Sequence, residues 1–406
     1  MRAAARAGTL LLAVWAAVLA CATGLAGAEP SLAVMQTAEY YRIRAEGFDA
    51  LYNMDYAAAR LKFEELKSRW PEHPAGYFYL AANLWVSILN SSRRLQTNLY
   101  AGDSFFAETK EKVDPRTDRE FRGLTAQAVS KAAAAVQQSA RDVDGLYFQG
   151  AAHGLIATYE GTVARSFISA LRNGLKAVNL HRKIIEIDPG FADAYLTIGS
   201  YDYVVGSLPW VVKVLVSFGG IRGSKERGLQ ELHIAAERAR YNSDDARVVL
   251  ITFYARERRE AEMLELLDAL SARYPRNYVF KLERAGALAR LGRSAESFKI
   301  YDQMLGEAAM KNVADLVHFQ YGDALAAGGD FARANGHFRA VIEIAGANQD
   351  LVTRAHLRSA QMLDQLHRRD EAVAEYKVVL ARENVFDSHE QATKLLKNPY
   401  VRTNER

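Results

Sequence analysis

The sequence predicts an all-α protein, and three observations lead to this prediction. Half of the 406 residues are hydrophobic and 25% are charged, as in globular chains that bury a large core. Proline is scarce, with 8 residues, whereas alanine, leucine, arginine and glutamate, which lose little rotamer entropy in a helix, are abundant. The third observation is a small residue that recurs with an aromatic residue four positions after it. A disordered or fibrous chain is therefore not expected.

The N-terminal segment, residues 1–28, has the pattern of a secretory signal peptide. Arg2 and Arg6 form a basic start, an apolar run covers residues 10–20, and Ala26-Gly27-Ala28 offers a small-residue cleavage site. The apolar run is shorter than the roughly 20 residues that span a bilayer. We therefore expect an exported chain, with the bacterial periplasm as its location.

Cys21 is the only cysteine, and it suggests an alternative fate for this segment. The residues 18–20 before it resemble a bacterial lipoprotein cleavage box, although Leu19 departs from the small residue usual there. A lipidated Cys21 would tether the protein to the outer membrane. In either case the rest of the chain has no cysteine, so disulfides and thiolate metal sites are excluded there.

A repeated pattern in the C-terminal third predicts helix pairs. Three pairs of a small and an aromatic residue recur at spacings of 37 and 38 residues: Ser297 and Tyr301, Ala334 and Phe338, Ala372 and Tyr376. Residues four apart share one face of a helix, where the small residue lets a neighbouring helix approach. In the clearest copy a first helix over 316–325 is interrupted at Gly328-Gly329, and Asp330 opens the second helix.

This helix, turn, helix unit resembles the tetratricopeptide repeat. Residues 40–84 and 170–382 carry the resemblance, with these positions at the family's spacing: Gly47, Ala59, Phe63, Leu66 and Pro71, then Ala177, Ile184 and Pro189, then Tyr195, Ile198 and Gly199, then Tyr274 and Pro275. The resemblance implies a right-handed superhelical solenoid of antiparallel helix pairs. Such stacked pairs share one continuous core and form a concave groove.

The predicted organisation after the signal peptide has four parts. An N-terminal repeat-like region with long atypical helices covers 29–190, because the resemblance fades between Ser87 and Asp142. The remaining parts are a central region over 191–275, the C-terminal repeats over 276–382, and a capping helix with a polar tail over 383–406. The central region contains an apolar helix over 209–218, which we expect to pack in the interior. A contact with a membrane or an apolar partner is the alternative, although Lys213 opposes insertion.

The resemblance also implies which residues face the groove, since the first helix of each pair lines it. Carried over by position, these residues are Arg44, Phe48, Tyr52, Phe78, Trp85, Leu196, Ser200, Tyr203, Glu283, Arg290, Phe319, Gln320, Asp323, Arg354, Arg358 and Gln361. The early groove would be aromatic and would suit an apolar peptide, whereas the late arginines would suit carboxylates. The alternative is that many of the aromatic residues only pack between neighbouring repeats.

No catalytic or cofactor-binding pattern accompanies the repeats. No two of the nine histidines are spaced four apart, as a helical metal pair requires. His153, on a predicted helix with several aromatic residues, is the one histidine that we single out as a candidate functional residue, with a core position as the alternative. The segment 219–225 has the glycines of a phosphate loop but the wrong order of serine and lysine, so Ser224 is expected to cap a helix. The charges over 256–260 are those of a solvated face or turn. We expect no cofactor, no metal and no enzymatic activity.

The sequence therefore predicts a non-enzymatic, exported scaffold that binds a protein or peptide partner. Nucleic acid is not expected, because 52 basic and 48 acidic residues leave a formal charge of only +4. One alternative is an envelope-assembly lipoprotein that is anchored through Cys21. Another is a carbohydrate-binding or enzymatic site in the atypical region 87–159.

Overall fold

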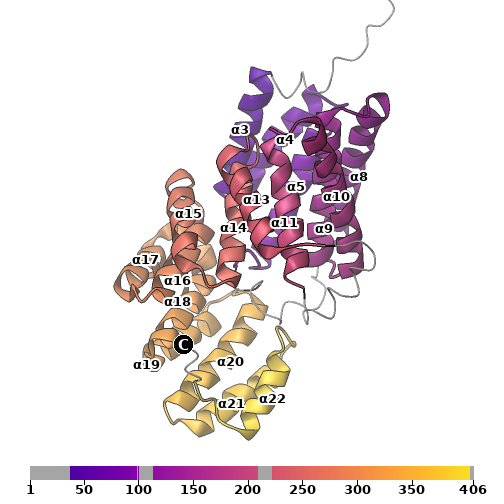
Figure 1. Cartoon of the computed structure of the whole chain (residues 1–406). Coiled ribbons are helices and arrows are strands. Elements are labelled where there is room, and N and C mark those ends of the chain that lie inside the picture. The colour runs from indigo at the N-terminus through magenta and orange to yellow at the C-terminus, as the bar shows by residue number, and fades with distance from the viewer. Residues whose placement is uncertain (1–36, 98, 100–112, 209–221, 403–406) are drawn as a thin grey trace, which may run out of the picture.

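The computed structural model describes residues 37–97, 99, 113–208 and 222–402 (Figure 1). Within these ranges the chain forms α-helices and two short 3-10 helices, with no strand, so the predicted all-α class is confirmed. None of the described helices is long and apolar enough to cross a membrane. The signal peptide, Cys21 and the predicted apolar helix over 209–218 lie outside the described residues.

The first half of the chain forms four consecutive helix pairs. The helices of these pairs are α3 (Ala38–Tyr52) with α4 (Tyr56–Arg69), α5 (Ala75–Ser91) with α8 (Pro115–Gln138), α9 (Val143–Thr162) with α10 (Phe167–Ile187), and α11 (Tyr195–Gly206) with α13 (Lys225–Arg238). The 3-10 helix η1 (Ala192–Ala194) precedes α11. Helices α8, α9 and α10 have 24, 20 and 21 residues, which confirms the long helices predicted for this region.

The second half continues the same arrangement with shorter helices. Its elements are α14 (Ser243–Arg256) with α15 (Glu260–Arg273), α16 (Tyr278–Arg290) with α17 (Ser294–Gly306), the 3-10 helix η2 (Ala308–Val313), α18 (Ala314–Gly328) with α19 (Phe331–Glu343), α20 (Gln349–Gln365) with α21 (Arg369–Leu380), and α22 (Ser388–Lys397). The last of these covers the apolar end of the final pair, where Ala392 is buried against α20 and α21.

The predicted small and aromatic pairs form the core of the C-terminal repeats. Ser297, Ala334 and Ala372 are fully buried, and so are the three rings that follow them by four positions. Gly322 in α18 shows why a small residue is needed opposite each ring, because a Cβ atom there would lie 2.8 Å from Phe338 Cε1. The rings therefore fill the space between successive helices, and the core runs from pair to pair.

Glycines bring α11 and α13 into direct backbone contact. A Cβ atom on Gly228 would lie 2.5 Å from the backbone nitrogen of Tyr203 and 2.6 Å from the carbonyl oxygen of Gly199. Gly206 and Gly223 meet backbone atoms of the opposite helix in the same way. Gly223, in the segment that has some features of a phosphate loop, thus serves close helix packing, and Ser224 caps α13 by accepting from the Arg227 N–H at 3.3 Å.

The turn between α18 and α19 follows the predicted pattern. Gly329 ends the first helix with a φ of +87°, a left-handed conformation that glycine adopts without strain. The Asp330 carboxylate then accepts from the Arg333 N–H at 3.2 Å and caps the second helix.

Replacing Asp330 with alanine is expected to lower the free energy of unfolding by about 1 kcal/mol, because the cap hydrogen bond is lost. Asp330→Asn, which keeps an acceptor oxygen, is the matched control and is expected to retain most of the stability. Denaturant unfolding of the three proteins measures both values, and equal stability of the two variants would contradict the capping role.

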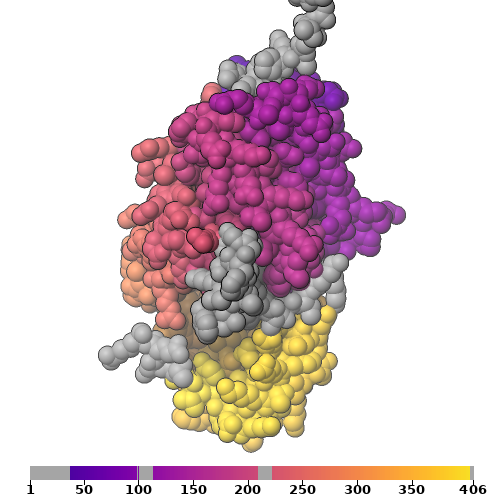
Figure 2. Space-filling view, turned by 45° about the vertical axis from the view of Figure 1, so that its right-hand side comes forward, coloured from indigo at the N-terminus to yellow at the C-terminus, as the bar shows by residue number. Residues whose placement is uncertain are grey.

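The two halves meet along several connecting loops. In Figure 1, helices α3 to α13 form the upper part of the molecule, α15, α17 and α19 lie at the left, and α20 to α22 lie at the bottom. Figure 2 shows the same arrangement in space-filling form, with the yellow C-terminal helices below the magenta ones. Loop residues join the halves directly: the Asn277 side chain donates to the Tyr52 carbonyl at 2.7 Å, and the Arg276 N–H donates to Asn53 Oδ1 at 3.2 Å.

Candidate functional site

The N-terminal part of the predicted groove is filled by contacts within the chain. The guanidinium of Arg44 donates to the Tyr79 hydroxyl at 3.1 Å and to the carbonyl of Tyr241, which is 197 residues away. It also lies 4.4 Å from the ring centre of Phe48, which packs edge-on against Phe63. The superhelix thus closes on itself here, and the inner face of α3 packs against the residues that precede α14.

Tyr52, at the end of α3, has one partner on α14 and one at the C-terminal end of α15. Its ring stacks on Tyr274 with centroids 4.7 Å apart, and its hydroxyl donates to the Asp245 carboxylate. Burial of Asp245 raises the pKa of this carboxyl to about 6, and the hydrogen bond from Tyr52 and the charge of Arg44 only partly oppose that rise. An ionised carboxylate at neutral pH is therefore held there at some cost in stability.

Phe78 and Trp85 on α5 also contact other helices of the N-terminal half. Phe78 lies edge-on to Phe148 with centroids 5.9 Å apart, and the Trp85 indole N–H donates to the Thr162 hydroxyl at 3.1 Å. Both side chains are partly buried. Phe78 and Trp85, which were predicted to line the early groove, thus pack between helices, as the alternative to a peptide-binding role implies.

The central residues of the predicted groove are similarly engaged. Tyr203 is buried, stacks on Phe253 with centroids 3.7 Å apart and donates to Glu257 at 2.7 Å. The Ser200 hydroxyl donates to the Leu196 carbonyl one turn earlier at 2.6 Å. Leu196 packs against the apolar cluster of α13 to α15.

Arg290 faces a second helix of a pair instead of the groove. Its guanidinium donates to Glu260 Oε1 at 3.2 Å and lies 3.7 Å from Met263 Sδ, and both partners belong to α15. Arg290 thus lies on a first helix, α16, as the repeat pattern implies. Its side chain, however, contacts α15 of the preceding pair.

The remaining predicted residues gather on the first helices of the last three pairs, and we call this set the C-terminal inner face. It consists of Glu283 on α16, Phe319, Gln320 and Asp323 on α18, and Arg354, Arg358 and Gln361 on α20. In Figure 1, α17 and α19 lie on the outer side of these helices.

Charged and aromatic groups on the C-terminal inner face contact one another across helices. Arg358 donates to Asp323 Oδ1 and to Gln361 Oε1, both at 2.8 Å. The guanidinium of Arg354 lies 4.5 Å from the ring centre of Phe319. Gln320 and Gln361 are both buried. The α18 and α20 parts of this face therefore form one surface with fixed side-chain positions.

A non-helical segment of the chain itself, residues 93–97, is seated beside this surface. Thr97 donates both its backbone N–H, at 2.8 Å, and its hydroxyl, at 2.6 Å, to the two carboxylate oxygens of Glu283. Glu283 is only 6% exposed, and this burial raises the pKa of its carboxyl, while the two hydrogen bonds from Thr97 oppose the rise. The Glu283 carboxylate on α16 thus accepts two hydrogen bonds from one residue of an irregular segment.

Arg93, at the other end of the 93–97 segment, contacts the start of α18. Its guanidinium lies 3.3 Å from Asp315 Oδ1 and donates to the Asn312 carbonyl. The second oxygen of the Asp315 carboxylate accepts the Asn348 N–H at 3.0 Å, at the entrance to α20. One buried carboxylate therefore links the segment to two successive repeats.

The middle of the segment is covered from the C-terminal side. Arg94 lies 5.0 Å from the ring centre of Phe386, and Arg354 lies at the same distance from that ring. Leu95 packs against apolar clusters of both halves of the chain. The segment thus occupies a position between the N-terminal helices and the C-terminal inner face.

Sequence reasoning missed the residues that occupy this surface. Arg93, Arg94, Thr97, Asp315 and Phe386 all lie in or beside connections between helices, where no helical period marks their direction. The adjacent arginines after an apolar helix were the only available signal, and they do not indicate which helices they contact.

The described residues contain no group of three or more His, Cys, Asp or Glu side chains that could hold a metal ion. His153 lies between α9 and α10, where its Nδ1 is 3.0 Å from Asn173 Oδ1. Burial lowers the pKa of His153, which favours the neutral ring in this contact between helices.

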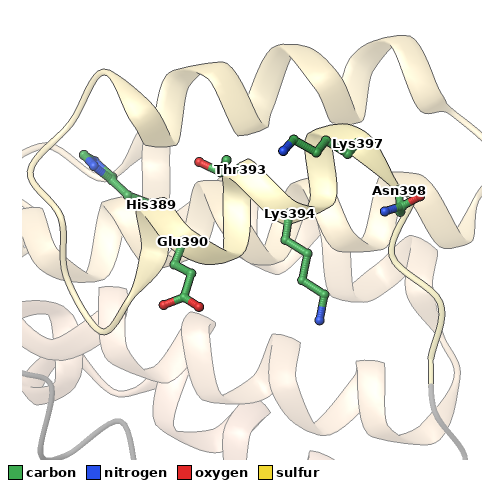
Figure 3. Close-up of a pocket in the computed structure, with 6 residues that line it drawn as sticks. All are labelled: His389, Glu390, Thr393, Lys394, Lys397 and Asn398. Carbon is green, nitrogen blue, oxygen red and sulfur yellow. The ribbon is translucent and has the colours of Figure 1, made fainter.

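Two hollows on the described surface each lie along one helix. One, of about 450 Å³, is lined by residues of α22 and its end, and Figure 3 shows Glu390 and Lys394 on one side of the helix while His389 and Lys397 point elsewhere. Another, of about 530 Å³, lies along α10. Because each is built on essentially one helix, neither brings reactive groups together from several elements.

Together the helix pairs and their shared core define a tetratricopeptide-like helical repeat protein. A model of the family described as Iml2/Tetratricopeptide repeat protein 39 matches residues 190–348, from the turn after α10 to the residue before α20. A comparison with curated proteins finds no match.

Solved structures with similar helical repeats are distant in sequence. The human IFIT1 dimer with m7Gppp-AAAA has 9% identity and a TM-score of 0.44 over 88% of this chain and 86% of that chain. Yeast Tom70 has 11% identity and a TM-score of 0.37 over 89% of each chain. A tetratricopeptide repeat protein from Parabacteroides merdae has 13% identity and a TM-score of 0.27 over 89% of this chain and 98% of that chain.

Proposed function

We propose that this protein is an exported, non-enzymatic scaffold that binds a protein or peptide partner on the C-terminal inner face. The observation that carries the proposal is the seating of residues 93–97, because Glu283 there receives a backbone N–H and a hydroxyl from an irregular chain segment. Recognition of backbone donors by a fixed carboxylate is a general means of holding a peptide. The arginines of α20 supply further contacts for a carboxylate.

Export to the periplasm is supported by the pattern of residues 1–28 alone. Fractionation of cells that produce the full chain, with and without residues 2–28, tests it. We expect the full chain with the periplasmic contents and the truncated chain in the cytoplasm, and equal distribution of the two would contradict export.

Photo-crosslinking in cells tests the binding surface. Ala327 is exposed and lies one helical turn after Asp323 on α18, so a photo-reactive amino acid at position 327 samples the C-terminal inner face. Position 339 on α19, where the Arg339 side chain is 61% exposed, is the matched control on the outer side. We expect a discrete protein partner from position 327 that position 339 does not capture. The same products from both positions, or none from position 327, would contradict the proposal.

A further inference from the structure

We propose that the 93–97 segment is a built-in pseudo-ligand, and that the partner is a peptide which replaces it through an arginine followed four residues later by a threonine or serine. This inference rests on the proposed function and adds the chemistry of the partner. The two ends of the segment define that chemistry, because Arg93 contacts Asp315 and Thr97 contacts Glu283.

The Glu283 carboxylate is the main determinant of this site. It projects from the middle of α16, is almost fully buried, and accepts hydrogen bonds from Thr97. A buried carboxylate is unfavourable unless hydrogen bonds or charges compensate for its lost hydration. One donor is a backbone N–H, which any peptide residue except proline supplies, and the other is a hydroxyl. The site therefore selects threonine or serine at this position.

The second determinant is the pair of acceptors for Arg93, 4 residues earlier in the chain. The Asp315 carboxylate and the Asn312 carbonyl both receive its guanidinium. Leu95 lies between the two polar ends and contacts the apolar core of the C-terminal repeats. Arginine, an apolar residue and a hydroxyl residue at alternate positions thus describe what the surface accepts.

The resident segment satisfies this surface incompletely. Gln96 Oε1 and Arg93 Nε are buried without a hydrogen-bond partner among the described residues. Each such atom has lost its hydration without a compensating hydrogen bond, which is unfavourable. A segment held with these losses is easier to displace than the packed rings of the repeats, and a peptide that avoids them competes favourably.

Tethering still gives the resident segment an advantage. A segment linked to its own site has an effective concentration on the order of millimolar, so a free peptide with equal contacts is mostly excluded. Its apparent dissociation constant is the intrinsic value divided by the fraction of molecules with a vacant site. Substitutions that weaken the contacts of the resident segment must therefore strengthen the binding of a free peptide. Substitution of a residue that itself binds the peptide would instead weaken that binding.

A fluorescently labelled synthetic peptide with the sequence of residues 91–99 provides the test. Its fluorescence anisotropy is followed as the purified full chain is added, for the wild type and for the Arg93→Ala, Thr97→Val double variant. We expect the double variant to bind at least 10-fold more tightly than the wild type. Adding Glu283→Gln to that variant is expected to weaken binding about 10-fold, since the charge-assisted acceptor is lost.

Matched controls make the result specific to this site. Glu260→Gln removes a carboxylate of α15 that pairs with Arg290, and it is expected to leave peptide binding unchanged. A peptide with valine in place of the threonine is expected to bind no protein tightly. Should the double variant fail to fold, as circular dichroism would show, Thr97→Val alone is measured and is expected to strengthen binding at least 3-fold.

Peptide binding that is no tighter in the released variants, or that is unaffected by Glu283→Gln, overturns the inference. That outcome is distinct from failure of the proposed function, because a partner captured from position 327 without peptide binding would leave the scaffold role intact. Peptide binding without a captured partner would retain the site chemistry and overturn the proposed cellular role.

Discussion

Replacing Gly228 with alanine is expected to lower the free energy of unfolding by about 2 kcal/mol or more, because overpacking here cannot be relieved by a rotamer change. The new Cβ atom would lie 2.5 Å from the Tyr203 backbone nitrogen and 2.6 Å from the Gly199 carbonyl oxygen. These are backbone atoms of α11, so the two helices must move apart. That movement also loosens the stacked rings of Tyr203 and Phe253, which hold α11 to α14.

The same substitution at Gly123 is the matched control for this prediction. Gly123 lies in the interior of α8, is exposed, and would place its Cβ atom in open space. Alanine there is expected to stabilise the protein by about 1 kcal/mol, the usual difference in helix propensity. Urea unfolding of the wild type and both variants measures the two effects. A Gly228→Ala protein as stable as Gly123→Ala would show that α11 and α13 are not in backbone contact.

The repeat fold was predictable because its signals are local. Ala334 and Phe338 lie one turn apart on α19, and Gly322 and Phe338 belong to neighbouring helices of one pair. A pattern of this kind specifies which helix packs on the next. It carries no information on curvature, so the contact between Arg44 and the Tyr241 carbonyl could not be predicted. Whether those two residues meet depends on the sum of the small rotations between all the helix pairs that separate them along the chain.

The site was predictable only in part, for a related reason. Position in the repeat assigned Asp323, Arg358 and Gln361 to first helices, and in the structure Arg358 donates to the other two side chains. It could not indicate that Thr97 donates to Glu283, because an irregular segment has no period that shows its direction. The aromatic character of Phe48 was likewise uninformative, since a ring suits a peptide groove and a helix contact equally.

The closure of the superhelix has an electrostatic consequence at Asp245. Burial raises the pKa of this carboxyl to about 6, and Tyr52 and Arg44 oppose the rise only in part. In the unfolded chain an aspartate titrates near 4, so between about pH 4 and pH 6 the folded state holds a proton that the unfolded state releases. The stabilising contribution of that proton is complete below about pH 4 and is lost as the pH rises through 6. Above pH 6 the carboxylate disfavours folding by a constant amount.

Asp245→Asn is therefore expected to stabilise the protein at pH 7, by up to about 3 kcal/mol from the pKa difference of roughly 2 units. The amide keeps an acceptor for the Tyr52 hydroxyl and does not ionise. Guanidinium unfolding from pH 4 to 7 should show variant and wild type alike at pH 4 and diverging up to about pH 6, with a constant difference above. Asp244→Asn is the contrast, because Asp244 pairs with Arg273 at 2.8 Å and accepts from Tyr274 at 2.6 Å, so its replacement should destabilise. A difference between Asp245→Asn and wild type that stays constant from pH 4 to 7 would mean that this carboxylate is hydrated, and that α3 does not close against α14 in solution.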